Sequence, residues 1–144
     1  MNNTFEKVCI VGLGLIGGSI GLAIKRSNIS NQITGYARSN STLERAIELG
    51  LVDSVKDNLK DAVNNSDLVI LATPLSTFRE LVEEMSPFLK KGCIITDTGS
   101  AKLTVIEDLK DILPNGVEFV PGHPIAGTEE SGPDAGFAEL FDNR

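Results

Sequence analysis

Short apolar runs alternate along this chain with segments of helical periodicity. Five runs, most of them rich in β-branched residues, predict buried strands over residues 7–11, 33–37, 68–72, 93–96 and 117–120. Between them, apolar residues recur every three or four positions, which predicts helices over residues 15–25, 41–49, 77–89 and 103–113. Asn28 and Gly50 are expected to end the first two helices, and Pro87 to break the last turn of the third.

This regular alternation with short connections predicts the fold class. Strands that follow one another through helices form an α/β fold, here a doubly wound and mostly parallel sheet in one domain over residues 1–144. A sheet of this kind binds its ligand at the carboxyl ends of the strands. The residues directly after each strand are therefore the candidates for chemistry.

A glycine-rich turn follows the first predicted strand. Gly12, Gly14 and Gly17 form a G-x-G-x-x-G pattern between a buried strand and an amphipathic helix. The first glycine suits a tight turn, the second the approach of a pyrophosphate, and the third close packing of helix on strand. The first-turn N–H groups, at Leu15 and Ile16, would face the phosphates. The turn predicts a Rossmann-type dinucleotide site, the alternative being packing glycines without a ligand.

The end of the second predicted strand bears on the choice between NAD and NADP. The acid that would bind a ribose 2′-hydroxyl is missing there, and the next carboxylate is Glu44 in the following helix. Arg38, with the hydroxyls of Ser39 and Ser41, suits a 2′-phosphate and favours NADP. Arg38 stacked on the adenine would serve NAD equally well.

Thr73 and Pro74 follow the strand at 68–72. Pro74 fixes the turn, so that the chain could run flat beneath a nicotinamide ribose. The alternative is a simple strand terminator.

Composition narrows the class of protein. The 144 residues carry a net charge of −7 without a Lys/Arg cluster, which argues against a nucleic-acid partner. The sequence contains no apolar run of membrane-spanning length and no signal-peptide pattern, which predicts a cytoplasmic domain. Cys9 and Cys93 stand inside apolar runs, which predicts buried, reduced thiols, the alternative being a single disulfide. No metal site is predicted.

Two polar residues after later strands are candidates for catalysis. His123, the only histidine, stands in a loop of Gly, Pro, Thr and Glu after the last strand. An imidazole suits the acceptance of a hydroxyl proton while hydride leaves, although it could simply bond backbone groups. Ser100 could bind a substrate oxygen, or simply cap the next helix.

Three stretches together resemble the nucleotide-binding domain of the prephenate/arogenate (cyclohexadienyl) dehydrogenases: VGLGLIGGSIGLAIK, TDTGSAK and VPGHPIAGTEESGPDAGFAELF. The resemblance covers essentially the whole chain. It implies NAD(P)-dependent oxidative decarboxylation of prephenate to 4-hydroxyphenylpyruvate, or of arogenate to tyrosine. It also implies that His123 is catalytic, that Ser100 assists at the substrate hydroxyl, and that Thr128 and Glu129 line or gate the substrate pocket.

One requirement of that chemistry is missing from the loops. A substrate with carboxylates needs cationic partners, whereas the loop after the last strand supplies Glu129, Glu130 and Asp134. In the family a C-terminal helical domain supplies carboxylate-binding groups and a dimer interface, so we expect this chain alone to bind dinucleotide but to turn over poorly. The alternatives are a β-hydroxyacid-type dehydrogenase domain and a non-catalytic dinucleotide-sensing module.

Overall fold

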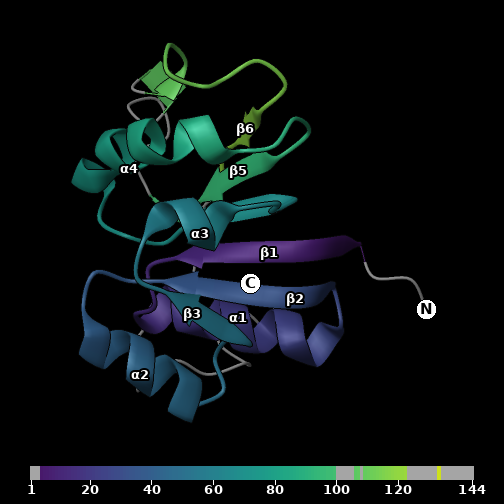
Figure 1. The fold of residues 1–144 in the computed structure, drawn as a ribbon, viewed down its shortest axis with the longest axis vertical. Coiled ribbons are helices and arrows are strands. Elements are labelled where there is room, and N and C mark those ends of the chain that lie inside the picture. Colours follow the sequence, from purple (N-terminus) through teal and green to yellow (C-terminus); the bar gives the residue numbers. More distant parts are fainter. Residues whose placement is uncertain (1–3, 100–105, 108, 123–132, 134–144) are drawn as a thin grey trace.

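The computed structural model describes residues 4–99, 106–107, 109–122 and 133. Within these residues, six parallel strands form one sheet in the order β3-β2-β1-β4-β5-β6 (Figure 1). Their bounds are β1 Phe5–Val11, β2 Ser30–Tyr36, β3 Ser54–Lys56, β4 Leu68–Leu71, β5 Ile94–Asp97 and β6 Glu118–Val120. The order reverses between β1 and β4, which confirms the predicted doubly wound sheet and opens a crevice at their carboxyl ends.

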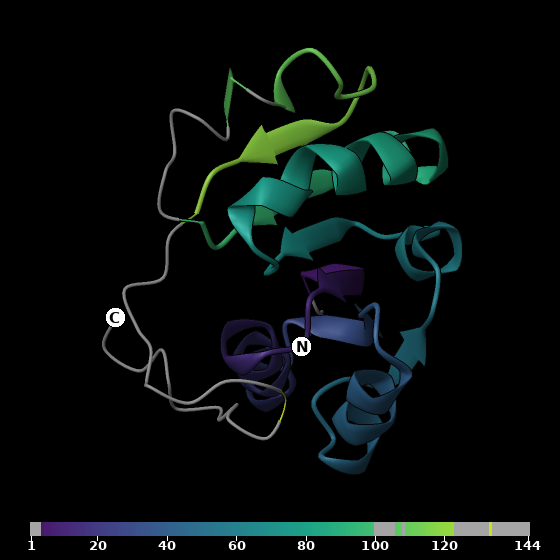
Figure 2. The same cartoon turned by 90° about the vertical axis from the view of Figure 1, so that its left-hand side faces the viewer.

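Helices cover both faces of the sheet. They are α1 Leu15–Ser27, α2 Asn40–Glu48, α3 Leu59–Val63 and α4 Phe78–Met85, with short 3₁₀ turns η1 Leu75–Thr77 and η2 Ser86–Phe88. Turned by 90°, the cartoon shows α1 and α2 on one side of the sheet and α3 and α4 on the other (Figure 2). The two cores follow the strand alternation: Val8 and Ile10 of β1 pack towards α1 and α2, and Cys9 and Val11 towards α3 and α4.

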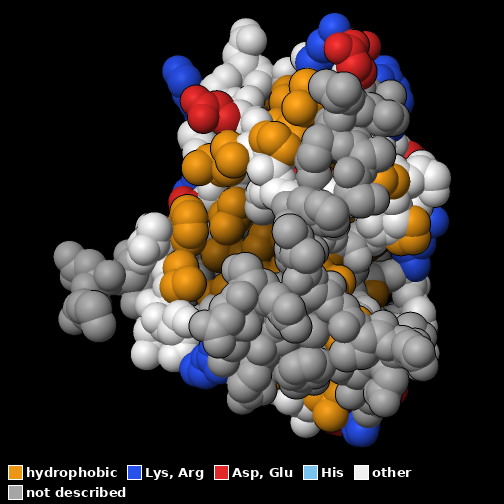
Figure 3. Space-filling view, turned by 180° about the vertical axis from the view of Figure 1, so that it is seen from behind, with side chains coloured by type: hydrophobic (Ala, Val, Ile, Leu, Met, Phe, Trp, Pro, Cys, Tyr) orange, Lys and Arg blue, Asp and Glu red, His pale blue; other side chains and the backbone are white. Residues whose placement is uncertain are grey.

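Apolar surface remains on the side that carries α1. Hydrophobic side chains gather there in the space-filling view from behind (Figure 3). The core on this side contains no residue of β5 or β6 among those that the structure describes, and Val120 of β6 is 48% exposed. Among the described residues, the packing on this side therefore covers the half of the sheet beneath α1 and α2 and does not extend to β5 and β6.

Two elements between residues 50 and 67 were not predicted. Strand β3 has three residues and none is buried, so it leaves no apolar run in the sequence. Helix α3 has five residues, too few for a periodic pattern. Its N-cap residue is Asn58, whose side chain accepts a hydrogen bond of 2.9 Å from the Asp61 N–H. The Asn58…Asp61 spacing was the available signal for this helix.

The structure confirms the predicted ends of two other helices and corrects one predicted start. Asn28 ends α1 in the left-handed conformation with φ of 52°, and α4 ends before Pro87 as predicted. The start of the helix predicted over 77–89 was wrong, because η1 occupies Leu75–Thr77 first. Within the range 103–113, residues 103–105 and 108 lie outside the described residues, and Ile106, Glu107 and Leu109 are helical.

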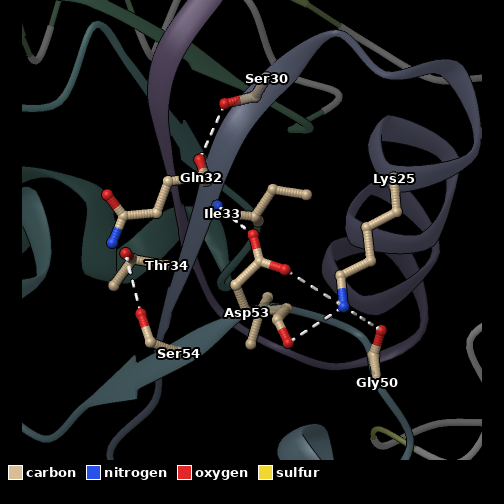
Figure 4. Close-up of polar contacts among 9 residues, drawn as sticks. Lys25, Ser30, Gln32, Ile33, Thr34, Gly50, Asp53 and Ser54 are labelled. Carbon is tan, nitrogen blue, oxygen red and sulfur yellow. Dashed lines mark hydrogen bonds and ion pairs between the residues drawn. The ribbon is translucent and has the colours of Figure 1, made fainter.

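The loop between α2 and β3 is held by one lysine. Lys25, in the last turn of α1, donates from Nζ to the carbonyl oxygens of Gly50 (2.8 Å) and Val52 (3.2 Å) and pairs with Asp53 at 3.5 Å (Figure 4). The Asp53 carboxylate in turn accepts from the Ile33 N–H at 2.8 Å. These contacts tie α1 and β2 to the loop that leads into edge strand β3.

Both cysteines are buried free thiols, as predicted. Burial raises the pKa of the Cys9 thiol to about 12 and that of the Cys93 thiol to about 11. Both side chains therefore remain neutral at physiological pH and act as small apolar core groups.

Candidate dinucleotide-binding site

The glycine-rich turn begins where β1 ends. Gly12 has a φ of 104°. Its N–H donates to the Tyr36 carbonyl at 2.9 Å, which continues the hydrogen bonding between β1 and β2 by one residue. A Cβ at this position would lie 2.7 Å from the Ala72 carbonyl oxygen. Both the backbone conformation and the space therefore exclude a side chain at Gly12.

The other two glycines meet different constraints. A Cβ on Gly17 would lie 1.8 Å from the Gly12 carbonyl oxygen, because the first turn of α1 packs directly on the end of β1. Among the described residues, no atom lies within 4 Å of a Cβ built on Gly14. Gly17 is thus required by packing inside the protein, whereas the described residues leave space beside Gly14 in which a ligand could approach.

The start of α1 is suited to an anion. Gly14 is its N-cap residue and offers no side-chain cap, and the first turn contains no acid. The N–H groups of Leu15, Ile16 and Gly17 lack acceptors within the helix, since the first N–H groups of any α-helix do. Together with the positive end of the helix dipole, they can hold a diphosphate at the β1–β4 crevice.

A cavity of about 360 Å³ adjoins this turn, between the carboxyl ends of β1, β2 and β4. Its lining consists of Gly12, Tyr36, Ala37, Arg38, Ser39, Thr42, Thr73, Pro74, Thr77 and Leu81. The structure thus brings together five residues predicted to bind a cofactor: Gly12, Arg38, Ser39, Thr73 and Pro74. The other five, Tyr36, Ala37, Thr42, Thr77 and Leu81, were missed, because a lining position on a strand end or helix face leaves no motif.

A larger groove of about 580 Å³ lies elsewhere, between α2, β3 and α3. It lies at the outer edge of the sheet and shares no lining residue with the cavity at the glycine turn. Ligands of doubly wound sheets bind where the strand order reverses, so the smaller cavity is the candidate site.

Arg38 enters the cavity wall from the end of β2. One of its terminal guanidinium nitrogens lies 3.8 Å from the Glu80 carboxylate of α4, and the two side chains are 63% and 73% exposed. An ion pair this exposed is weak, so the guanidinium can exchange it for a ligand phosphate. Beside it, Ser39 caps α2 by accepting from the Thr42 N–H, and the hydroxyls of Ser39 and Ser41 lie 2.7 Å apart.

The loop after β4 forms the opposite wall. The Thr77 hydroxyl bonds the Thr73 hydroxyl at 2.8 Å and donates to the Pro74 carbonyl at 2.6 Å. The Thr77 N–H donates to the same carbonyl at 3.0 Å, closing η1. Pro74 therefore begins a rigid turn beside the cavity, three residues after β4 ends at Leu71.

A buried carboxylate, which the sequence argument did not single out, lies along the same edge. Asp97 ends β5, is 2% exposed, and accepts from the N–H groups of Gly99 at 2.8 Å and Gly122 at 3.1 Å. The signal for it in the sequence was an acid at the end of an apolar strand. The predicted catalytic and substrate-binding residues Ser100, His123, Thr128 and Glu129 lie outside the described residues, so their roles stay predictions.

The described part of the chain offers neither a metal site nor a membrane span. No group of three or more His, Cys, Asp or Glu side chains is arranged there to hold a metal ion. No helix among those residues is long and apolar enough to cross a membrane.

Comparison with known proteins identifies relatives along nearly the whole chain. The family model for the nucleotide-binding domain of prephenate dehydrogenase matches residues 20–144. The chain is 47% identical to the cyclohexadienyl dehydrogenase of Zymomonas mobilis over 137 residues, which cover 95% of this chain and 46% of that protein. It is 37% identical to the prephenate dehydrogenase of Bacillus subtilis over 99% of this chain and 39% of that protein. The chain thus spans less than half the length of these relatives.

Solved structures show the same likeness. The prephenate dehydrogenase of A. aeolicus in complex with hydroxyphenyl propionate and NAD+ superposes with a TM-score of 0.88 at 35% identity, over 98% of this chain and 49% of that one. The arogenate dehydrogenase of Synechocystis gives 0.84 at 32% identity, over 93% and 46%. The six-stranded order and the glycine turn therefore belong to a shared architecture.

Proposed function

Since this chain belongs to the prephenate dehydrogenase family and comprises its nucleotide-binding domain, we propose that it binds NAD(P) for the oxidative decarboxylation of prephenate or arogenate. The observation that carries the proposal is the uncapped start of α1 beside a cavity at the β1–β4 crevice. The diphosphate would lie on the N–H groups after Gly14, and the adenosine between Arg38 and the Thr73–Pro74 turn. The free, buried thiols support a reducing compartment, the cytoplasm.

The same site favours NADP over NAD. The cavity wall at the end of β2 contains no carboxylate to accept from a 2′-hydroxyl, and instead presents Arg38. The Ser39 and Ser41 hydroxyls at the start of α2 can donate to a 2′-phosphate, and the helix dipole adds to this preference. Glu80 opposes it through its ion pair with Arg38.

In the proposed chemistry His123 accepts the proton of the ring hydroxyl, and Ser100 assists at the same oxygen. The bound cofactor would supply the hydride acceptor. Loss of carbon dioxide then turns the ring into a phenol, and aromatisation makes the step essentially irreversible. Thr128 and Glu129 would line the substrate pocket.

The substrate carboxylates need cationic groups beyond those predicted in the loops. We propose that these come from a second, helical part of the protein corresponding to the remaining length of the relatives, through which the protein also dimerises. On this proposal, the 144-residue chain binds dinucleotide and turns over prephenate poorly.

Fluorescence titration with NADPH and NADH tests the site directly. The wild-type chain should bind both with a preference for NADPH, and Arg38→Asp should reverse the preference by removing the phosphate partner and supplying an acceptor for a 2′-hydroxyl. Arg79→Asp serves as the charge-matched control, because the Arg79 guanidinium pairs with Asp111 and the residue does not line the cavity. An unchanged cofactor ratio in Arg38→Asp contradicts the NADP assignment, and failure of the wild-type chain to bind either dinucleotide contradicts the function.

A further inference from the structure

The Asp97 carboxylate joins two loops that lie far apart in the sequence. Its Oδ2 accepts from the Gly99 N–H at 2.8 Å and its Oδ1 from the Gly122 N–H at 3.1 Å. Gly99 follows β5 and Gly122 follows β6, so one side chain holds the peptides that leave two neighbouring strands. A carboxylate that is 2% exposed is stabilised by such charge-assisted bonds, which replace part of the hydration it loses on burial.

Both loop positions are glycines because the backbone comes close to Asp97. A Cβ on Gly99 would lie 2.9 Å from Asp97 Oδ2, and a Cβ on Gly122 would lie 2.9 Å from the Asp97 carbonyl oxygen and 3.1 Å from Thr96 Oγ1. Separations this short require the surrounding atoms to move. The two glycines and the carboxylate therefore form one closely fitted unit.

The chain continues from each glycine into a residue of the proposed mechanism. Ser100 is bonded to Gly99 and His123 to Gly122. We propose that Asp97 is a positioning residue that holds the peptides before Ser100 and His123 at a set separation. This inference rests on the proposed function, in which the Ser100 and His123 side chains act on one substrate hydroxyl. Catalytic groups placed by an outer partner lose activity when that partner is removed, because small displacements of reacting groups are costly.

The single histidine provides a signature for this role. Because His123 is the only one in the chain, its imidazole contributes one resolved set of NMR signals, and the backbone amides of Gly99 and Gly122 report the two hydrogen bonds. Asp97→Asn keeps the size of the side chain but replaces one of its two acceptor oxygens by an amide that cannot accept. Amide exchange at one or both glycines should accelerate at least about tenfold, and the imidazole signals should move.

Asp67→Asn is the matched control. The Asp67 carboxylate also accepts from two backbone N–H groups, those of Glu6 at 2.7 Å and Lys7 at 3.2 Å. Asp67 directly precedes β4 and therefore lies at the amino ends of the strands, whereas Asp97 lies at their carboxyl ends. Its replacement should leave the imidazole signals and the exchange at Gly99 and Gly122 unchanged, although it lowers stability. A purely structural role for Asp97 predicts that both variants lower stability and that neither moves the imidazole signals.

A second variant tests the idea if Asp97→Asn folds poorly. Gly122→Ala keeps the carboxylate and inserts a Cβ where only 2.9 Å is free, so it should move the same imidazole signals. Unchanged imidazole signals in a folded Asp97→Asn or Gly122→Ala chain overturn the proposal. NADPH binding is measured in parallel, and its absence in the wild-type chain contradicts the proposed function. The imidazole signals test the positioning role of Asp97 independently of that result.

Discussion

Alanine at Gly17 and alanine at Gly14 should separate the packing role of one glycine from the ligand-facing role of the other. In Gly17→Ala the new Cβ would lie 1.8 Å from the Gly12 carbonyl oxygen, so α1 must move away from β1 by about 1.5 Å to restore ordinary contact. Overpacking of this kind costs about 3 kcal/mol, and the higher helix propensity of Ala offsets about 1 kcal/mol. The net loss of about 2 kcal/mol should lower Tm by about 4–8 °C.

The same displacement carries the first-turn N–H groups away from the diphosphate. Losing two charge-assisted hydrogen bonds of about 1.5 kcal/mol each should weaken NADPH binding about 100-fold. Gly14→Ala should behave differently, because its Cβ meets no atom of the described residues within 4 Å. Its stability should change by less than about 1 kcal/mol, the effect of a poorer N-cap. Its affinity should nevertheless fall at least about tenfold, since the methyl group occupies the path of the pyrophosphate.

Thermal unfolding and NADPH fluorescence titration of the two variants provide the measurements. Wild-type stability in Gly17→Ala would show that α1 does not pack on β1 as described. Wild-type affinity in Gly14→Ala would show that the diphosphate does not pass over this residue. Equal losses of stability in both variants would contradict the division of roles.

Three further outcomes follow from the contacts. Glu80→Gln removes the acid that faces Arg38, so NADPH affinity should rise about two- to fivefold in the same titration, with NADH affinity unchanged. Lys25→Met removes the bonds to Gly50 and Val52 shown in Figure 4 and should lower the free energy of unfolding by about 1–2 kcal/mol in urea. Burial raises the pKa of Cys9 to about 12 and of Cys93 to about 11 from an ordinary 9.0, so unfolding alone exposes ionisable thiols. This contribution to stability should be complete below pH 9 and decline as pH rises from 9 towards 12, by up to about 1.4 kcal/mol per pH unit and thiol.

Each of these outcomes has a control in the same chain. Lys110→Met, an exposed lysine in an i,i+3 pair, should change stability little, and a loss equal to that of Lys25→Met would contradict the importance of the loop contacts. A chain with Cys9→Ala and Cys93→Ala should lose the alkaline decline attributed to the thiols. Persistence of the full decline in that chain would assign it to other groups.

The candidate site was partly readable from local patterns. Gly12 to Gly17 could be found because a tight turn, an open helix start and close packing all act within six consecutive residues. Arg38 and Thr73 could be found because each directly follows a predicted strand, and Pro74 because it stands next to Thr73. Tyr36 and Leu81 could not, since their place in the cavity wall depends on how β2 and α4 come together.

The sequence by itself determined the strands β1, β2, β4 and β5, because each contains a short apolar run that predicts a strand. It could not determine β3 and α3, which are short and whose pairing partners lie elsewhere in the chain. Nor could it show that Asp97 bonds Gly122, 25 residues away, because the two meet only after β5 has paired with β6. Features that depend on neighbouring residues can be recognised in the sequence, whereas contacts between strand ends form only when the sheet brings the strands together.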